Sequence, residues 1–360
     1  MRAVSIPSRR KPPHLVKIVV TGAAGFLGSR VVERLRAGGH EVVAVDRVAS
    51  GLEHRAAEAV IRIDLAHAEL REVFEGAASL VHLAGGFPVD AVSLDGAADD
   101  IDVAMRVLEH AAGVGVRHAL VLSTAMVYGA WPNNPIPLTE DAPVRPNPEF
   151  AFAVQRAELE RRAFAWRAGC PGVSLAVLRP TVIVADGLPS RVARLLRQVA
   201  AIRTDEDPPA QYLHVDDLVE AIVVATTTEV DAVLNIAPDG WIRPETLNAL
   251  AWNRPRPRVS RWVLNAVAEL RWRSGIASAP PGIVAYTVYP WVVANDRIRA
   301  LGWQPSNSNE EAFVAAHEAG PLAMMNARRR QQISLGVAGG LVATIVGAIG
   351  WVLFRRRVRR

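Results

Sequence analysis

The chain has 360 residues, of which 50% are hydrophobic and 21% are charged, so it can bury one large or two modest cores and is not extensively disordered. Its single cysteine, Cys170, excludes an internal disulfide framework. The formal net charge is +5, but the basic excess lies in residues 1–12 and 328–360. The remainder is net acidic, which argues against a nucleic-acid-binding surface, and we expect no nucleic acid among the partners.

Residues 16–46 predict a strand, a glycine-rich turn, a helix and a second strand. The first strand is the apolar, β-branched run "VKIVV", and the helix repeats apolar residues at positions 27, 31, 32 and 35. Gly22, Gly25 and Gly28 lie in the turn and the first helical turn. Their missing side chains let backbone N–H groups and the positive helix end approach a pyrophosphate. This context predicts a dinucleotide site.

Asp46, at the end of the second strand, supports the same prediction. Its carboxylate can accept hydrogen bonds from both hydroxyls of an adenosine ribose. Because an unmodified ribose suits this acid, we expect NAD as the cofactor. Arg47 beside it leaves NADP open.

Seven motifs in order along the chain resemble those of the extended short-chain dehydrogenase/reductases, the NAD-dependent epimerase/dehydratase group. The resemblance covers roughly residues 16–318. The motifs are "TGAAGFLG" at 21–28, "IDL" at 63–65, "VHLAGG" at 81–86, "LSTAMVYG" at 122–129, "VLRPTVIV" at 177–184, "YLHVDDLVEAI" at 212–222 and "LGWQP" at 301–305.

The resemblance implies an α/β fold with a doubly wound parallel (Rossmann) sheet and a smaller C-terminal substrate region. Alternating strand and helix patterns independently indicate the same class. We expect residues 15–185 with 212–235 to form the NAD(P)-binding domain. Residues 186–211 with 236–320, the least recognisable part of the chain, are expected to form the substrate region.

The resemblance also implies which residues hold the cofactor. The glycine turn meets the pyrophosphate, the Asp-Leu pair of "IDL" meets the adenine, and the "LRP" segment lies near the nicotinamide. The expected cofactor-binding residues are Gly22, Gly25, Phe26, Leu27, Gly28, Asp46, Arg47, Asp64, Leu65, Leu83, Ala84, Gly85, Arg156, Pro180, Thr181 and Val182.

The catalytic residues implied by the resemblance are a Ser/Thr, a tyrosine and a lysine, and only the first is present. Thr124 occupies the Ser/Thr position. Aligning "QRAELE" with the family's usual x-K-A-E-L-E puts Arg156 at the lysine position and Phe152 at the tyrosine position. The alternative register gives Phe150 and Val154, so either alignment places a phenylalanine where the acid belongs.

Phenylalanine keeps the shape of tyrosine but has no proton to exchange, and the pKa of arginine, above about 12, prevents it from titrating. The asparagine that usually follows the H-L-A-A motif aligns with Asp100. Tyr128 fits the structural tyrosine of its motif, and the family's histidine positions are expected to be packing residues: His82, His118 and His214. Asp100 or Asp90 would act as an acid only if buried. We therefore expect weak, altered or absent turnover.

Two functions stay open from the sequence. The first is an NAD(P)-binding protein without efficient turnover. The alternative is an active epimerase, dehydratase or hydroxysteroid-type oxidoreductase that uses a replacement acid on a nucleotide-sugar, lipid-linked or hydrophobic alcohol or ketone substrate. Whether the protein is an enzyme is left open. No metal-ligand spacing is present, and a metal site is not expected.

The C-terminus predicts a transmembrane helix. Residues 333–354 contain 22 residues without a charge, enough to span a bilayer core of about 30 Å, and arginines flank both ends. With the basic tail 1–14, a basic linker 321–332 and the arginine-rich end 355–360, this suggests a single-pass anchor, a cytoplasmic main domain and contact with membrane lipid. A homodimer through the core or this helix is also expected.

Tryptophans and arginines alternate between residues 241 and 291. This composition suits either a bilayer interface or aromatic core residues with a solvated arginine face. The tryptophans are Trp241, Trp252, Trp262, Trp272 and Trp291.

Overall fold

The computed structural model describes most of the chain up to residue 316, and all structural statements below refer to that part. The described residues are 15–47, 60–85, 97–186, 188–189, 193, 202–204, 206–251, 255–275 and 280–316.

A seven-stranded sheet with the order β10-β6-β5-β4-β1-β2-β3 forms the centre, and each neighbouring pair is parallel. The order reverses between β1 and β4, because the chain builds outward in one direction from β1 to β3 and then in the other from β4. This is the point at which doubly wound sheets bind ligands. The strands are β1 (Lys17–Thr21), β2 (Glu41–Asp46), β3 (Val60–Arg62), β4 (Ser79–His82), β5 (His118–Leu122), β6 (Ser174–Pro180) and β10 (Ala232–Ile236).

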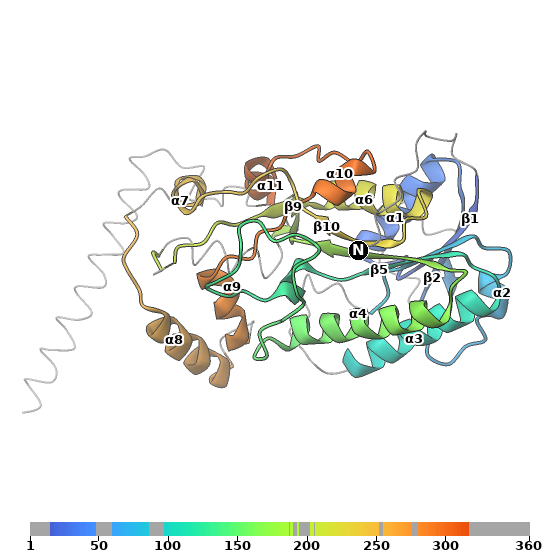
Figure 1. Ribbon diagram of the computed structural model, residues 1–360, viewed down its shortest axis with the longest axis horizontal. Helices are drawn as coiled ribbons and strands as arrows, with labels where there is room; N and C mark the ends of the chain where they lie inside the picture. Colours follow the sequence, from blue (N-terminus) through green and yellow to red (C-terminus); the bar gives the residue numbers. More distant parts are fainter. Residues whose placement is uncertain are drawn as a thin grey trace, which may run out of the picture. The chain divides into compact units, whose positions relative to one another are not determined.

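Helices cover both faces of this sheet (Figure 1). On one face α1 (Phe26–Ala37) packs beside α6 (Val215–Thr227), and on the other α3 (Ala97–Gly113) packs beside α4 (Ala151–Gly169) with the short α2 (Arg71–Phe74). The arrangement confirms the predicted α/β fold with a doubly wound parallel sheet.

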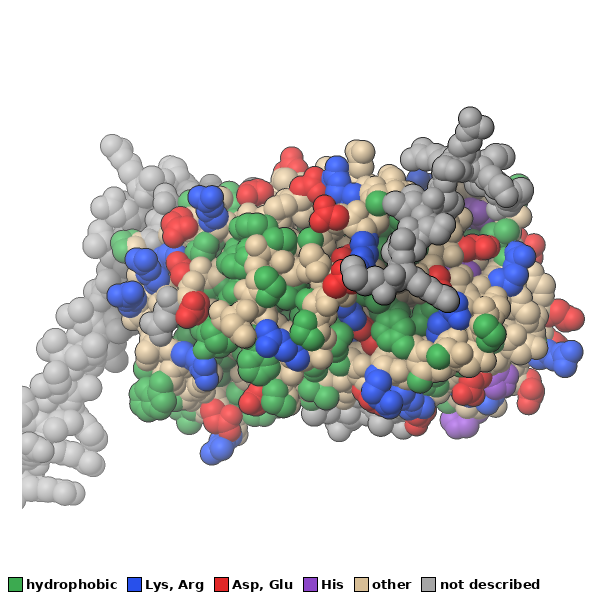
Figure 2. Space-filling view, viewed as in Figure 1, with side chains coloured by type: hydrophobic (Ala, Val, Ile, Leu, Met, Phe, Trp, Pro, Cys, Tyr) green, Lys and Arg blue, Asp and Glu red, His purple; other side chains and the backbone are tan. Residues whose placement is uncertain are grey.

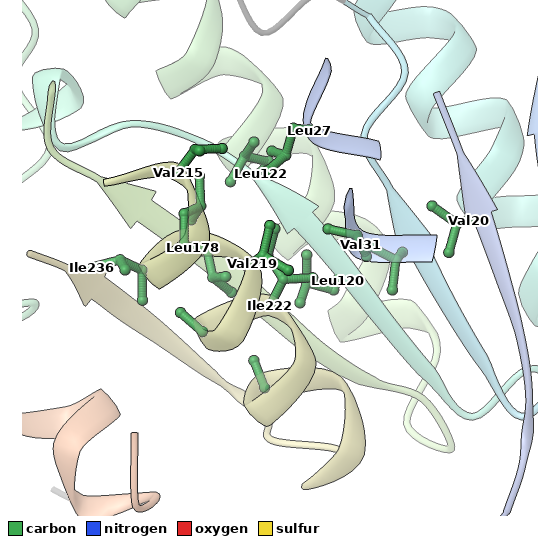
Figure 3. Close-up of a cluster of buried hydrophobic side chains, with 14 of the residues drawn as sticks. Val20, Leu27, Val31, Leu120, Leu122, Leu178, Val215, Val219, Ile222 and Ile236 are labelled. Atoms are coloured by element: carbon green, nitrogen blue, oxygen red, sulfur yellow. The ribbon is translucent and has the colours of Figure 1, made fainter. Parts of the chain in front are cut away.

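Continuous apolar strands explain why both faces are covered. The side chains of β4 and β5 are buried along their whole length, so neither face of these strands meets water. Each fully buried aliphatic side chain contributes about 1.5–3 kcal/mol through loss of apolar surface from water. Figure 3 shows the layer between the sheet and helices α1 and α6, which includes Val20, Leu27, Val31, Leu120, Leu122, Leu178, Val215, Val219, Ile222 and Ile236.

The remaining elements follow or interrupt the central sheet. A small sheet has β7 between β8 and β9, and a separate apolar cluster joins it to the C-terminal helices. These elements are the 3-10 helix η2 (Ala125–Tyr128), β7 (Val182–Ala185), β8 (Leu188–Pro189), β9 (Tyr212–His214), α7 (Pro244–Ala251), α8 (Arg261–Arg273), the 3-10 helix η3 (Pro281–Val284), α9 (Ala285–Val288), α10 (Asp296–Ala300) and α11 (Asn309–Ala316).

The prediction of a membrane-spanning helix is wrong for the part of the chain that the structure describes. None of the helices there is both long and apolar enough to cross a bilayer. The 19-residue α4 has the length, but six of its residues are arginine or glutamate. Residues 333–354, on which the prediction rests, lie outside the described residues, as do the two tails and the basic linker. The described part of the chain therefore gives no support to the predicted membrane anchor or to the predicted membrane location.

The tryptophan-rich segment divides between core and surface. Trp291 is buried in the C-terminal cluster, whereas Trp262 on α8 is 77% exposed. Figure 2 shows hydrophobic side chains on the surface at the lower left, where Figure 1 places α8. Trp252 lies outside the described residues.

His118, buried at the start of β5, should make stability depend on pH. Burial lowers the pKa of its imidazole to about 4, although Asp231 opposes the shift. The unfolded state, with a histidine pKa near 6.5, therefore binds more protons between pH 6.5 and 4. We expect the free energy of unfolding to fall by up to about 3 kcal/mol from this residue as pH decreases through that window.

Urea denaturation of wild type and His118→Asn at pH 7, 6, 5 and 4.5 checks this expectation. The substitution should remove part of the pH dependence. His110→Asn, which replaces a partly exposed histidine on α3, controls for loss of a histidine as such. Parallel pH curves for wild type and His118→Asn would contradict the assignment.

Candidate cofactor-binding site

The glycine turn after β1 lies directly against the end of β4. Gly22 has φ +71°, and a Cβ there would lie 2.6 Å from the Ala84 nitrogen and 2.7 Å from the Leu83 carbonyl carbon. A Cβ on Gly28 would lie 2.0 Å from the Gly22 oxygen, to which the Gly25 nitrogen donates a hydrogen bond at 3.1 Å. Side chains are therefore excluded at Gly22 and Gly28, and the backbone faces the site.

Asp46 ends β2 beside this turn. The Ala24 backbone nitrogen donates a hydrogen bond to Asp46 Oδ2 at 2.9 Å, which holds the carboxylate next to the glycines. The Ile63 nitrogen donates to the Asp46 carbonyl oxygen at 2.9 Å and ties the chain after β3 to the same place. The acid predicted for a ribose thus lies beside the turn predicted for a pyrophosphate.

These groups line one cleft of about 840 Å³ at the carboxyl ends of the strands. The predicted cofactor-binding residues that line it are Gly22, Gly25, Phe26, Leu27, Gly28, Asp46, Arg47, Asp64, Leu65, Leu83, Ala84 and Gly85. The cleft spans the point between β1 and β4 where the strand order reverses.

Four predicted cofactor residues lie outside the lining of this cleft. From the "LRP" segment Ile183 lines it, whereas Pro180, Thr181 and Val182 do not, and Thr181 lines a different cavity. Arg156 lies in a small cavity of about 30 Å³ that adjoins the cleft.

Arg106 on α3 is a cleft residue that the sequence reasoning missed. Its Nη2 donates to the Ala68 carbonyl at 2.7 Å and its Nε to the Leu65 carbonyl at 3.2 Å, so it fixes the segment after β3. Asp102, four residues earlier on the same helical face, also lines the cleft. The spacing of Asp102 and Arg106, four residues apart on one helix face, is the sequence feature that could have indicated Arg106. The other unpredicted lining residues are Ile63, Ala66, His67, Asp100, Val103, Ile183 and Val215.

Arg156, Asp100 and Gly85 line the small cavity beside the cleft. Arg156 Nη2 donates to the Gly85 carbonyl at 2.9 Å. Gly85 has φ +92°, and a Cβ there would lie 3.3 Å from the Cβ of Asp100. Burial lowers the pKa of the Arg156 guanidinium, and the negative charge of Asp100 opposes that shift. The arginine, the aspartate and the glycine are therefore neighbours in space.

Phe152 and Arg156 share one face of α4. The Arg156 guanidinium carbon lies 5.5 Å from the centre of the Phe152 ring. In the other register, Phe150 is buried against Tyr286 with ring centres 5.2 Å apart, and Val154 is exposed. In the Phe152 and Arg156 register the two side chains contact each other, and Arg156 reaches the Gly85 carbonyl after β4.

Thr124 is buried at the start of η2, directly after β5. Its Oγ1 accepts a hydrogen bond from the Met126 nitrogen at 3.3 Å. Met126 belongs to the apolar cluster against which Phe152 packs. The serine or threonine position and the tyrosine position are thus on adjoining elements.

The tyrosines near this region are poor proton donors. Burial raises the pKa of Tyr128, whose hydroxyl donates to Asn235 Oδ1 at 2.8 Å and accepts from Arg179 Nη1 at 2.7 Å. Burial also raises the pKa of Tyr286, whose hydroxyl donates to the Met126 carbonyl. Both hydroxyls are engaged within the protein.

His82 is buried at the end of β4. Its Nδ1 lies 2.8 Å from Thr21 Oγ1, and burial, assisted by the positive charge of Arg156, lowers the pKa of the imidazole to about 4. His82 is therefore neutral near pH 7. Like His118, it packs in the sheet as expected.

A buried ion pair fixes α4 against the sheet. Arg179 on β6 donates through Nε to Glu160 Oε1 at 2.9 Å, and Ser123, next to Thr124, donates to the same carboxylate. Both charged side chains are at most 3% exposed. Because Glu160 lies one helical turn from Arg156, this pair sets the position of the helix face that carries Phe152 and Arg156.

Residues 18–237 match the model of the NAD dependent epimerase/dehydratase family. The chain belongs to this family. This match confirms the predicted family. Because the family is NAD dependent, it also confirms NAD as the expected cofactor.

Individual relatives share part of the sequence. A 3-diazoavenalumate denitrifying reductase from a Streptomyces species is 30% identical over 319 residues, covering 81% of this chain and 97% of that protein. The UDP-glucose 4-epimerase of Mycolicibacterium smegmatis is 30% identical over 231 residues, 58% of this chain and 73% of that protein.

The crystal structure of a UDP-glucose 4-epimerase from Thermus thermophilus in complex with NAD matches with a TM-score of 0.61 and 21% identity, covering 83% of this chain and 97% of that one. The likeness shows a shared fold. The comparisons give no support for a membrane-lipid or homodimeric partner of this epimerase/dehydratase family member.

Replacing Gly22 with alanine should strongly weaken NAD binding by this family member. The new Cβ would clash with the backbone of β4 and force the turn away from the pyrophosphate position. Binding is measured by titrating NADH and following its fluorescence. We expect at least about a hundredfold weaker binding for Gly22→Ala, equivalent to about 2.7 kcal/mol.

Gly113→Ala is the matched control, because a Cβ at Gly113 would meet nothing within 4 Å. It should bind NADH like wild type. Unchanged binding by Gly22→Ala would exclude the glycine turn from the cofactor site.

Proposed function

We propose that this protein binds NAD in the cleft between β1 and β4 and has weak or absent redox turnover. The proposal rests on one combination of features. The glycine turn and Asp46 are present, whereas a phenylalanine occupies the tyrosine position. Cofactor binding depends on the first feature and proton exchange depends on the second.

The cleft fits a dinucleotide. The backbone of Gly22, Gly25 and Gly28 would hold the pyrophosphate at the N-terminus of α1, and Asp46 would hold the adenosine ribose. When bound, NAD accepts or returns a hydride. Arg156, in the small cavity that adjoins the cleft, would hold the nicotinamide ribose by charge-assisted hydrogen bonds.

The chain's own residues supply little for the accompanying proton. Phe152 has no exchangeable proton, and the Arg156 guanidinium stays protonated at neutral pH. Thr124 can orient a substrate oxygen by hydrogen bonding, but a hydroxyl of ordinary acidity does not replace a tuned acid. General acid–base catalysis typically contributes about 10²- to 10⁴-fold, so we expect a loss of that size.

The substitutions support one coordinated change. Arg156 donates to the carbonyl of Gly85, and the Asp100 side chain that balances its charge lies against the Cα of Gly85, where an alanine would be crowded. If only Phe152→Tyr and Arg156→Lys were made, the carboxylate of Asp100 would remain beside the side chain at position 156.

The alternative function is an active oxidoreductase with a replacement acid. Among the described residues that line the small cavity with Arg156, the titratable groups other than Arg156 itself are His82 and Asp100. His82 is held by Thr21, whereas Asp100 lies beside Arg156 and also lines the cleft, so Asp100 is the residue to test. Loss of wild-type turnover in Asp100→Asn would support this alternative.

Restoring the acid tests the main proposal. In Phe152→Tyr, we expect the introduced phenol to have a pKa lower than the usual value of about 10, because the Arg156 guanidinium lies close to this ring position. Ultraviolet absorbance titration of the ionised phenol measures this pKa without any substrate.

Phe164→Tyr is the matched control, because Phe164 is exposed on the same helix. Its phenol should titrate near the usual value. Equal pKa values in the two variants would show that position 152 is not next to the cation.

Turnover is then compared among wild type, Phe152→Tyr with Arg156→Lys, and the same pair with Asp100→Asn. Each protein is assayed with NADH and cyclohexanone, and with NAD and UDP-galactose. We expect the triple variant to show the largest gain, at least about tenfold over wild type. Efficient wild-type turnover, at or above that of the variants, would overturn the proposal.

A further inference from the structure

Helix α8 lies on the surface and buries none of its 13 residues. It packs against η3, and its partly buried residues include Leu264 and Ala268, which are four apart and therefore share one face. An isolated helix of about 12–15 residues is marginal in water, so helices in proteins normally depend on burying an apolar stripe. The described elements bury little of α8.

The apolar stripe of α8 faces solvent instead of the protein. Trp262, Ala266 and Leu270 follow one another at four-residue spacing, and Val263 and Val267 lie beside them; these five residues are called the α8 face below. Trp262 is 77% exposed and Leu270 is 70% exposed. Contiguous exposed apolar side chains of this kind mark a site of interaction with another molecule.

Basic side chains border the α8 face. Residues 258–273 contain four arginines, at positions 258, 261, 271 and 273, and a single acid, Glu269. Glu269 is already paired with Arg273 at 2.7 Å. Arg258 lies in register with Arg203, and both are exposed. An occupant of the α8 face therefore meets a net positive border.

This border disfavours a second copy of the chain as the occupant. If two α8 helices packed antiparallel, Arg261 of one copy would lie beside Arg273 of the other. If they packed parallel, Arg271 and Arg273 would each lie beside their own counterparts. Like charges across an interface are unfavourable, and Glu269 is the one acid on α8 that could offset them.

A helix with acidic flanks fits both properties of this surface. Apolar side chains three and four residues apart on such a helix would pack along the α8 face, and its glutamates or aspartates would meet the arginines at the border. Docking would also remove Trp262 from water. Tryptophan and arginine are the residue types that most often dominate the binding energy of interfaces.

We propose that the α8 face docks an acidic amphipathic helix of a partner protein. The proposal goes beyond the proposed function and does not rest on it, because no residue of α8 is among the described residues that line the cofactor cleft. A face of one short helix is small for a stable interface. We therefore expect a transient complex with a dissociation constant of about 10–100 µM.

Binding of a model helix to the full-length protein tests the proposal. The probe is a fluorescein-labelled peptide of about 18 residues, long enough to form a helix, with leucine along one face and glutamate along the other. A second peptide has lysine in place of every glutamate. Fluorescence anisotropy should show saturable binding of the glutamate peptide and at least about tenfold weaker binding of the lysine peptide. Equal affinities would overturn the proposal.

Trp262→Ala and Leu270→Ala test the apolar stripe. Each should weaken binding of the glutamate peptide at least about tenfold, because each removes a large side chain from the centre of the contact. Both side chains are mostly exposed and alanine favours helix, so both variants should fold. Leu15→Ala is the matched control, because Leu15 is 68% exposed, close to Leu270, and lies outside α8. Binding that is insensitive to both α8 substitutions would overturn the proposal.

Arg271→Gln combined with Arg273→Gln tests the basic border. The double variant should bind the glutamate peptide at least about threefold more weakly than wild type, and its affinity should depend less on added NaCl, because salt screens exposed charges. Arg117→Gln, which replaces an exposed arginine before β5, is the control and should behave like wild type. An unchanged affinity and salt dependence in the double variant would contradict the charge complementarity.

The other possible occupants are tested with the same variants. Light scattering after size-exclusion chromatography measures self-association, and co-sedimentation with vesicles of phosphatidylglycerol and phosphatidylcholine measures lipid binding. Neither should depend on Trp262 or Leu270. A dimer that dissociates in Trp262→Ala would overturn the proposal in favour of a second copy, and vesicle binding that is lost in this variant would overturn it in favour of an anionic lipid surface.

The melting temperature of each variant, followed by circular dichroism, should match that of wild type. Peptide binding is measured without NAD, so its outcome is independent of the proposed function. Peptide binding by a protein that does not bind NADH would refute the proposed function alone. NADH binding by a protein that does not bind the glutamate peptide would refute the assignment of the α8 face alone.

Discussion

The close approach of the Gly22 turn to the end of β4 is the constraint on which the site depends. With only 2.6 Å between a Gly22 Cβ position and the Ala84 nitrogen, the turn and the strand end form one surface. That surface is the floor of the cleft. Asp46 is tied to the same turn through the Ala24 nitrogen, so the two parts of the dinucleotide site move together.

The buried pair Arg179 and Glu160 performs a similar role for the other end of the site. It joins β6 to α4, and Ser123 adds the end of β5. Removing one partner of such a pair leaves a buried charge and typically destabilises a protein by about 3–5 kcal/mol. The helix with Phe152 and Arg156 is therefore held as firmly as a catalytic helix would need to be.

Local patterns in the sequence were enough to predict the first two strands of the sheet and the turn between β1 and α1. Buried parallel strands read as continuous apolar runs, and the glycine turn follows the first of them, so the positions of Gly22 and Asp46 could be expected. Contacts between distant segments could not. Asp207 and Arg256 are 49 residues apart, and nothing local signals their pairing. Thr181 was predicted from its motif to bind the cofactor, and it lines a different cavity from the cleft. The membrane helix was predicted from the uncharged run 333–354 with arginines at both ends, and these residues lie outside the described part of the chain. None of the helices that the structure describes is long and apolar enough to cross a bilayer.

A crystal structure of the full chain grown with NAD tests the central claim most directly, because it shows the cofactor and every possible proton donor together. The account predicts NAD in the cleft, with its pyrophosphate at the glycine turn, its adenosine ribose at Asp46 and Phe152 beside the nicotinamide. An empty cleft at saturating NAD, or a tyrosine or carboxylic acid within hydrogen-bonding reach of a substrate oxygen at the nicotinamide, would contradict it.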